Sequence, residues 1–291
     1  MPELPDLTIV AEAFHGALAG RPIVAARAVA PLAVRGTASE LEALVERTLV
    51  AVRRRGKFLL LELDAGRIAV NPMLSGRFQL APDSRRATPG VAVVLGFGPR
   101  ARGPHDAARW TAGAPWLPAD DATVEVRYRD PTQMGKVYLL PDDGSRSAPG
   151  LGPPDQGPDA DDPALDLAAW RDRIRRHPGE LKGLLRNQAF VAGIGNAYSD
   201  EILHAARLSP FRKRPSLAAE EVDELHRATR ATLANAVEIL RQRVPPTFER
   251  QIRDFLAVHL RGGDACPRCG TRISQVSSRG EATSFCRGCQ R

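Results

Sequence analysis

The pattern of hydrophobic and polar positions is mostly typical of β-strands in the first half of this 291-residue chain and of helices in the second. Apolar residues at positions 7, 10, 14 and 18 recur with helical spacing, which predicts a helix over residues 5–19. Short alternating or apolar runs follow and predict strands. A short helix at Ala38–Arg47 interrupts them, and so many short strands favour a sandwich or barrel. The predicted strands are Pro22–Ala30, Leu49–Arg55, Lys57–Leu63, Arg67–Asn71, Val91–Phe97, Thr123–Arg129 and Lys136–Leu140.

A break in composition follows these strands. Residues 141–163 hold six prolines and four glycines, and residues 141–170 hold seven aspartates against one arginine, which predicts an interdomain linker. The period then becomes helical, at Pro163–Arg176, Glu180–Asn187, Tyr198–Ala206, Leu217–Arg241 and Thr247–His259. We therefore expect an α+β chain with an N-terminal domain at 1–140, a linker at 141–163, a helical domain at 164–260 and a cysteine module at 261–291.

Four cysteines, all within the last 26 residues, form two Cys-x-x-Cys pairs, Cys266 with Cys269 and Cys286 with Cys289. Sixteen residues separate the pairs, which is the right length for a β-hairpin, and four thiolates so arranged suit tetrahedral Zn²⁺. A redox dithiol or chance spacing is the alternative. Four protein ligands leave no open position, so we expect one structural zinc per chain and a module that unfolds without it.

The balance of charge narrows the class of partner. Lys and Arg outnumber Asp and Glu by 41 to 34, and residues 241–291 hold ten Arg against four Asp or Glu. This surplus indicates a polyanionic partner. No apolar stretch approaches the roughly 18 residues of a membrane span, and the start does not resemble a signal peptide. We therefore expect a cytoplasmic, nucleoid-associated protein with no membrane partner.

The start of the chain carries candidate chemistry. Removal of Met1 would leave Pro2 as a secondary amine that can attack an aldehyde carbon and form an iminium. Glu3 beside it could transfer protons or stabilise an oxocarbenium ion. A frayed terminus is the alternative interpretation.

Two internal stretches suit phosphate. Lys57 follows Gly56 in a basic turn between two predicted strands and could present an ammonium group to phosphate, or simply be solvated. Gly193 and Gly195 precede a predicted helix, whose first amides could hold a phosphate together with Asn196. Close packing at an ordinary helix joint is the alternative for these glycines.

These pieces occur together and in this order in one family. The chain resembles, over its whole length, the formamidopyrimidine-DNA glycosylase and endonuclease VIII family of base-excision repair enzymes. The resemblance rests on Met-Pro-Glu-Leu-Pro-Asp at the start, Arg-Arg-Gly-Lys57, Leu74-Ser-Gly-Arg77, Gly195-Asn-Ala-Tyr198 and the zinc finger ending in Cys289-Gln-Arg. It implies an N-terminal helix plus a two-sheet β-sandwich, a helix–two-turns–helix domain and a terminal zinc-finger hairpin, in a usually monomeric protein that binds double-stranded damaged DNA.

The resemblance also implies roles for single residues. Pro2 would be the nucleophile at C1′ of the damaged nucleotide, Glu3 its acid/base partner, and Lys57 would assist from its hairpin. Asn196 would contact phosphate near the lesion, and Glu201 would support the wall of the active site. The implied enzyme is a bifunctional DNA glycosylase and AP lyase that flips the base, displaces it through an iminium and nicks the strand by β- and δ-elimination. No small-molecule cofactor is needed.

The sequence departs from the family pattern at two places. The family's hairpin carries an arginine that clamps the phosphates flanking the lesion, and Glu281 stands at that position here. Because a carboxylate repels phosphate, Arg279 is the candidate substitute. The family's Asp-Pro-Arg-x-Phe appears here as Asp130-Pro-Thr-Gln-Met134. The candidate intercalating wedge is therefore Leu74, Gln133 and Met134, with core packing as the alternative, and Arg77 is a further candidate DNA contact.

The substrate and two rival functions stay open at this point. Residues 243–263 are short compared with the loop that covers an oxidised purine in the formamidopyrimidine-type branch, so we expect oxidised pyrimidines or abasic sites rather than 8-oxoguanine. One rival is a non-catalytic or weakly catalytic relative that recognises damaged DNA, which Glu281 and Thr132 favour. The other is a zinc-ribbon nucleic-acid binder with an unrelated N-terminal half.

Overall fold

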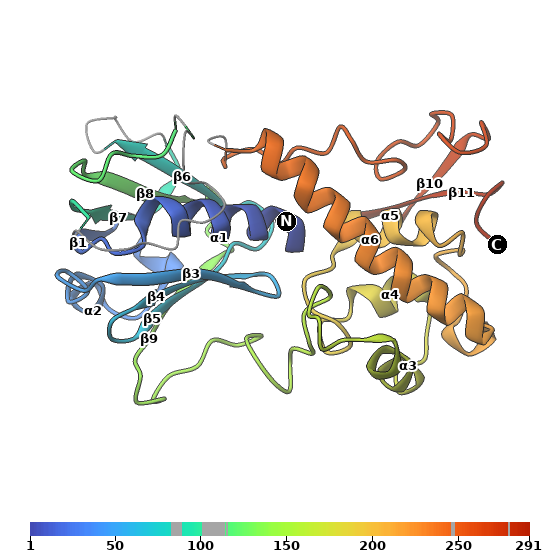
Figure 1. Cartoon of the computed structure of the whole chain (residues 1–291), viewed down its shortest axis with the longest axis horizontal. Coiled ribbons are helices and arrows are strands. Elements are labelled where there is room, and N and C mark those ends of the chain that lie inside the picture. Colours follow the sequence, from blue (N-terminus) through green and yellow to red (C-terminus); the bar gives the residue numbers. More distant parts are fainter. Residues whose placement is uncertain (83–88, 101–113, 115, 246–247, 279) are drawn as a thin grey trace. The chain divides into compact units, whose positions relative to one another are not determined.

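The computed structural model describes residues 1–82, 89–100, 114, 116–245, 248–278 and 280–291 (Figure 1). The chain divides into two compact units. Unit 1 comprises Met1–Pro2, Asp6–Leu151 and Leu240–Gln251, and unit 2 comprises Glu3–Pro5, Gly152–Ile239 and Ile252–Arg291. Residues 3–5 therefore belong to unit 2, although almost the whole of unit 1 follows them in the sequence.

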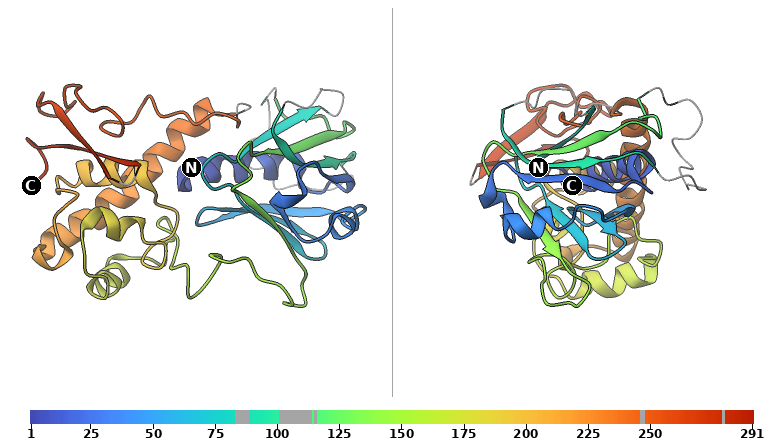
Figure 2. Two further views of the ribbon diagram at one scale, coloured as in Figure 1. Left: turned by 180° about the vertical axis from the view of Figure 1, so that it is seen from behind. Right: turned by 90° about the vertical axis from the view of Figure 1, so that its left-hand side faces the viewer.

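Unit 1 contains two β-sheets, as the family resemblance implied. Its strands are β1 (Ile23–Ala28), β2 (Val34–Arg35), β3 (Leu49–Arg55), β4 (Phe58–Leu63), β5 (Arg67–Asn71), β6 (Arg77–Pro82), β7 (Val91–Phe97), β8 (Val124–Arg129) and β9 (Lys136–Leu140). One sheet has the order β1-β7-β8-β6 and the other β2-β9-β5-β4-β3. Neighbouring strands are antiparallel except β2 and β9. The sheets form two separate layers (Figure 2).

Helix α1 (Leu4–Leu18) contacts both of these sheets. The ring of Phe14 meets Phe78 of β6 edge-on, with centroids 6.0 Å apart. Thr8 Oγ1 accepts a hydrogen bond of 2.9 Å from Arg54 Nε of β3. A helix that is covered on more than one side needs apolar residues beyond a single stripe, which explains why Ile9 is buried as well as Phe14.

A buried guanidinium lies just after α1. The side chain of Arg21, which is 0% exposed, donates to the carbonyls of Ala17 (2.9 Å), Gly98 (3.0 Å), Ala119 (2.7 Å) and Ala122 (2.6 Å). Burial lowers its pKa from the ordinary value, and the carbonyl groups take the place of water around the charge. Arg21 thereby fastens two loops of unit 1 to the end of α1.

Unit 2 is mainly helical and ends in a hairpin. Its elements are α3 (Leu167–Arg175), α4 (Leu181–Arg186), α5 (Asn196–Ala205), most of α6 (Ala219–Arg243), β10 (Ile273–Ser278) and β11 (Glu281–Cys286). Trp170 of α3 is fully buried and packs edge-on against Phe190. The same core includes Leu4 from the start of the chain. The α+β prediction is thus confirmed. Within the described ranges, no helix combines the length and apolar character that crossing a bilayer requires.

Several predicted elements are wrong in detail. The helix predicted at Thr247–His259 is absent from the described part of that range, because Phe248 packs on Phe14 and the amides of residues 257–259 donate to Glu201. Strands β2 and β6 escaped prediction, since β2 has only two residues and β6 ends at a proline and contains the buried Gln79. The helix predicted at Ala38–Arg47 is the shorter α2 (Ala38–Glu42), capped by Thr37 and Glu40.

The proline-rich stretch at 141–163 makes contacts of its own. Ala160 is buried in the core of unit 2, and its amide donates to the carbonyl of Ala192. The amide of Gly157 likewise donates to the carbonyl of Gln188. The second part of this stretch is therefore built into unit 2.

We expect Arg21→Met to lower the free energy of unfolding by about 3 kcal/mol or more, because it removes the donor of four hydrogen bonds to backbone carbonyls, two of which are buried. Urea denaturation followed by circular dichroism measures the loss. Arg35→Met is the matched control, since Arg35 is exposed, and it should change stability by no more than about 0.5 kcal/mol. An equal loss in the two variants would contradict the role assigned to Arg21.

Candidate functional site

Glu3 lies at the N-terminus of α5, within unit 2. Its side chain is 3% exposed, and its carboxylate accepts hydrogen bonds from the amides of Gly195 (2.6 Å), Ala197 (2.9 Å) and Tyr198 (3.3 Å). The first turn of a helix leaves such amides without intrahelical partners, and the helix dipole favours an anion there. The anion that these amides bind in the structure is thus an internal carboxylate rather than a phosphate.

Two glycines allow this close approach. A Cβ atom on Gly195 would lie 2.5 Å from Cδ of Glu3. Gly193 has a φ of 100°, and its carbonyl accepts a hydrogen bond of 2.9 Å from the amide of Leu4. The two glycines of the Gly-x-Gly sequence therefore bind residues 3 and 4 through their backbone groups. The sequence alone did not reveal these contacts.

Pro2 is buried in unit 1, where it lines a cavity of about 20 Å³ together with Asp6, Arg77, Phe248 and Gln251. Arg77 Nη2 donates to Gln251 Oε1 at 2.8 Å, so the start of β6 and the segment after α6 meet at this cavity. Such a space has room for about one water molecule. Arg77, predicted as a DNA contact, thus forms part of the wall beside Pro2.

Lys57 lies in the two-residue turn between β3 and β4, next to Gly56, whose φ is 56°. Arg54 donates through Nε to Thr8 of α1 and through Nη1 to the carbonyl of Gly56 at 3.4 Å. One side chain thereby connects the turn that carries Lys57 to the helix that follows Pro2.

Asp130 joins the two loops that carry the predicted wedge. Its buried carboxylate accepts hydrogen bonds from Ser75 Oγ, from Thr132 Oγ1 at 3.1 Å and from the amide of Gly135 at 2.6 Å. Burial opposes ionisation of Asp130, but these hydrogen bonds outweigh it and lower its pKa. The hydroxyl of the exposed Thr132 is therefore hydrogen-bonded within its own loop.

The predicted wedge residues are exposed. The exposed fraction is 56% for Leu74 and 45% for Met134, which is the opposite of core packing. Gln133 is also exposed and has a φ of 53°, and Met73 beside Leu74 has a φ of 47°. Strained backbone at exposed loop tips is typical of functional sites.

Asn196 and Glu201 both lie on α5. Asn196 Nδ2 donates to the carbonyl of Ala282 at 2.9 Å and has a second hydrogen to offer. Glu201 accepts from the amides of residues 257, 258 and 259 at 2.8–2.9 Å, and burial raises its pKa although these amides offset part of the effect. Glu201 thus anchors the segment that leads into the cysteine module.

Sequence reasoning missed a buried ionic network beside Asn196. Lys182 Nζ donates to Asp200 at 2.6 Å and to the carbonyl of Ala282 at 3.0 Å. The other carboxylate oxygen of Asp200 lies 2.8 Å from Nδ1 of His259. Burial lowers the pKa of Lys182, against the attraction of Asp200. The only signal in the sequence is opposite charges on adjacent predicted helices, which does not specify a contact.

Glu281, the first residue of β11, forms an ion pair of 2.6 Å with Arg186 at the end of α4. The carboxylate is therefore paired with a cation. Arg279, the candidate substitute for a phosphate-clamping arginine, lies outside the described residues.

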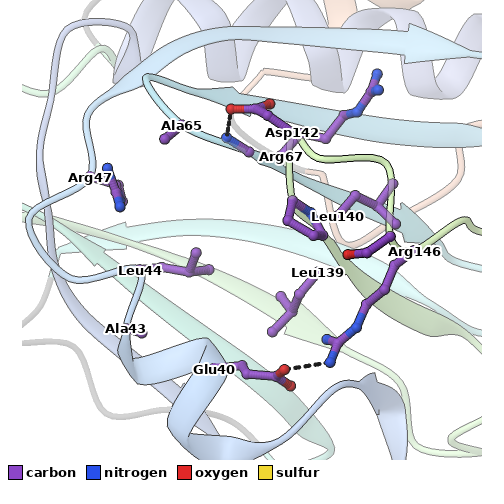
Figure 3. A pocket seen from close by; sticks show the side chains of 13 residues that line it. Glu40, Ala43, Leu44, Arg47, Ala65, Arg67, Leu139, Leu140, Asp142 and Arg146 are labelled. Carbon is purple, nitrogen blue, oxygen red and sulfur yellow. Dashed lines mark hydrogen bonds and ion pairs between the residues drawn. The ribbon is translucent and has the colours of Figure 1, made fainter.

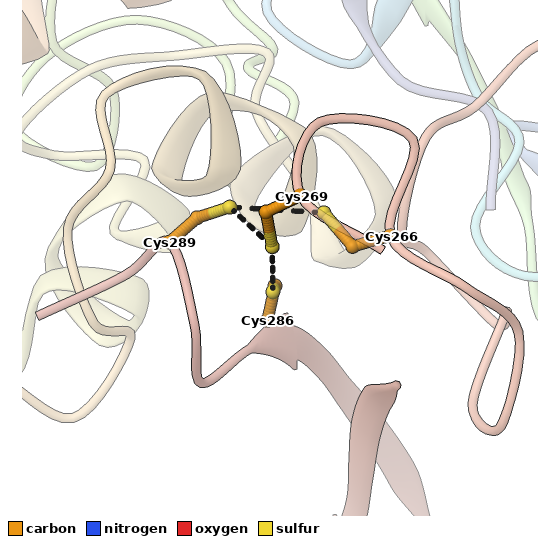
Figure 4. A group of neighbouring side chains, drawn as sticks. All are labelled: Cys266, Cys269, Cys286 and Cys289. Carbon is orange, nitrogen blue, oxygen red and sulfur yellow. Dashed lines mark hydrogen bonds between the residues drawn. The ribbon is translucent and has the colours of Figure 1, made fainter. Parts of the chain in front are cut away.

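The four cysteines converge as their spacing predicted (Figure 4). Their Sγ atoms all lie within 4.8 Å of one another, with separations of 3.1 Å for Cys269–Cys289, 3.5 Å for Cys269–Cys286 and 3.7 Å for Cys266–Cys289. Sulfur atoms bound to one tetrahedral Zn²⁺ would be about 3.8 Å apart, so the cluster fits a metal ion of this kind. His204 Nε2 lies 3.4 Å from Cys266 Sγ, and burial lowers the pKa of His204 to about 4.

A separate pocket of about 380 Å³ in unit 1 contains none of the predicted site residues (Figure 3). Leu139 and Leu140 contribute apolar surface. Its two carboxylates have partners within the chain, Glu40 with Arg146 and Asp142 with the amide of Gly66.

The comparisons with known proteins agree with this arrangement. Residues 1–137 match the model of the formamidopyrimidine-DNA glycosylase N-terminal domain, and residues 156–244 match that of the formamidopyrimidine-DNA glycosylase H2TH domain. The formamidopyrimidine-DNA glycosylase of Herpetosiphon aurantiacus is 31% identical over 299 residues, with all of both chains covered. The chain belongs to the formamidopyrimidine-DNA glycosylase family. Its relative of that name from Geobacillus kaustophilus is 30% identical over 300 residues, again with both chains covered.

Solved structures of the family have the same fold. The Lactococcus lactis Fpg in complex with abasic-site DNA gives a TM-score of 0.81 at 24% identity, over 99% of each chain. The same protein with DNA that contains Fapy-dG gives 0.81 at 24% identity, over 99% of this chain and 100% of that one.

We expect Gly195→Ala to destabilise the protein by about 1–3 kcal/mol, because the added methyl group overlaps the carboxylate of Glu3. Gly183→Ala in α4 is the matched control, since no heavy atom lies within 4 Å of its added Cβ, and it should stabilise slightly. Thermal unfolding and hydrogen exchange at amides 195–198 measure the effect. Equal stability and equal protection in the two variants would refute this account of Gly195.

We expect Cys286→Ser to lose most of the bound metal and the protection of the hairpin amides, because the small hairpin depends on its ligand set. Metal content and hydrogen exchange measure both effects. Ser277→Ala, at an exposed position of β10, should keep one metal ion per chain. Full metal content in Cys286→Ser would show that this thiol is not a ligand.

Proposed function

We propose that this protein is a bifunctional DNA glycosylase and AP lyase of base-excision repair, with Pro2 as its nucleophile. The observation that carries the proposal is that both N-terminal residues have fixed surroundings. Three amides donate to Glu3 at the start of α5. Pro2 lines a cavity beside Arg77 and Gln251. A frayed terminus would have neither contact. The Lactococcus lactis relative was solved with abasic-site DNA, which supports damaged duplex DNA as the ligand.

Once Met1 is removed, the reaction begins at the ring nitrogen of Pro2. Its lone pair attacks C1′ of the flipped nucleotide, and the bond from C1′ to the base breaks as the base leaves with a proton. Opening of the sugar ring gives an iminium between the nitrogen and C1′. Loss of a proton from C2′ then expels the 3′ phosphate, and a second elimination expels the 5′ phosphate. We assign proton transfer to Glu3, phosphate contact to Lys57 and Asn196, and the filling of the vacated stack to Leu74, Gln133 and Met134.

We further propose that the cysteine cluster holds one structural Zn²⁺ and that the preferred substrates are oxidised pyrimidines or abasic sites. The family fold and the four-thiolate donor set support zinc. The described residues of the segment after α6 support the substrate: Arg253 binds Tyr198, and the amides of residues 257–259 bind Glu201. This leaves little chain there to fold over a purine. A lesion panel on which 8-oxoguanine opposite cytosine is the best substrate would overturn the preference.

Borohydride trapping on duplex DNA with an abasic site tests the function. Wild type should form a covalent adduct, because borohydride reduces an iminium to a stable amine, and Pro2→Gly should form at least about tenfold less. Pro5→Gly is the control for a nearby proline, and it should still trap. Absence of any adduct from wild-type protein that lacks Met1 would favour a non-catalytic binder of damaged DNA.

A further inference from the structure

Donor side chains from two helices converge on the start of β11, the second strand of the hairpin in unit 2. Arg186, the last residue of α4, pairs with Glu281 at 2.6 Å. Lys182 of α4 and Asn196 of α5 both donate to the carbonyl of the next residue, Ala282, at 3.0 and 2.9 Å. Three side chains, from both ends of α4 and from the start of α5, therefore meet the first two residues of β11.

Lys182 and Arg186 differ in how far their side chains and ion pairs are buried. The side chain of Lys182 is 8% exposed and bound to Asp200, which is 0% exposed, so this pair is part of the interior. The side chains of Arg186 and Glu281 are 33% and 51% exposed. Solvent-exposed ion pairs add little to stability, so another anion can replace one of their members at low cost.

A DNA phosphate is such an anion. Guanidinium groups bind phosphate and carboxylate with the same bidentate geometry, and both bonds are charge-assisted. Around Arg186, Lys182 carries a second positive charge and Asn196 still has a hydrogen to donate. Glu281 is the half-exposed negative charge in this cluster, and it is also the group that an approaching phosphate would meet.

We propose that Arg186 contacts a DNA phosphate and that this phosphate replaces the carboxylate of Glu281, which holds the guanidinium in the DNA-free protein. The inference rests on the proposed function, because it needs DNA as the ligand. It adds a residue to the DNA-binding surface and makes Glu281 an internal competitor. Glu281 then lowers the affinity for DNA by two routes: it occupies Arg186 before binding, and it repels the polyanion afterwards.

The test uses full-length protein and a duplex with a tetrahydrofuran abasic-site analogue, with binding measured by fluorescence anisotropy at several salt concentrations. Arg186→Gln should weaken binding about tenfold and lower the salt slope by about 1, since one phosphate contact is lost. Arg186→Lys should keep the slope. Glu281→Gln should bind several-fold more tightly at low salt, because the competitor is gone.

Arg171→Gln is the matched control. Arg171 forms a half-exposed ion pair with Asp223 that connects α3 to α6, so its loss removes the same charge from unit 2. This variant should keep the wild-type slope. Metal content and thermal unfolding of each variant verify that the hairpin is intact.

Two outcomes would overturn the inference. One is a salt slope that changes equally in Arg186→Gln and Arg171→Gln, and the other is Glu281→Gln that binds no more tightly than wild type. If the wild-type protein forms the borohydride adduct with abasic-site DNA and either of these results is obtained, only the proposed replacement of Glu281 by phosphate at Arg186 is wrong. If wild type neither binds the duplex nor traps, the proposed function itself fails.

Discussion

The seat of Glu3 is the constraint on which the rest of the candidate site depends. A carboxylate that is 3% exposed must find donors, and here the first turn of α5 supplies three. The residues on either side follow from this. Gly195 must lack a side chain to make room, and Gly193 must adopt a positive φ so that its carbonyl meets the amide of Leu4. Pro2, one residue earlier, then has very little freedom.

Much of the architecture could be predicted from the sequence, because it depends on local pattern. Alternating or apolar runs predicted seven of the nine strands of the two sheets, and the Cys-x-x-Cys spacing predicted the cluster of four thiols. The change of period at the proline-rich stretch predicted the change from sheets to helices. Strand β6 was missed because Gln79 breaks the apolar pattern. The side chain of Gln79 is nevertheless buried, and its Nε2 donates a hydrogen bond of 2.8 Å to Glu249. Because Glu249 is so far from Gln79 in the sequence, no local pattern around residue 79 indicates that this polar side chain is buried.

The same reason explains why the polar contacts of the site were not predictable. The sequence identified Pro2, Glu3, Lys57 and Asn196 as candidate residues, but not the groups that position them. Asp130, which joins the two wedge loops, and Arg54, which connects the turn at Lys57 to α1, each act through a partner about 50 residues away. Such partners are defined only once the chain has folded, since side-chain geometry decides which donor meets which acceptor.

The contact between Glu3 and Ala197 spans 194 positions, and this has a consequence for biosynthesis. A ribosome delivers Glu3 first and its amide donors only after two thirds of the chain has been made. Until then the three amides of α5 that bind this carboxylate have not been made, so the contact cannot form. Closure of so long a loop is entropically costly and slow. The hydrogen bonds that fix Glu3 therefore depend on a segment translated long after it.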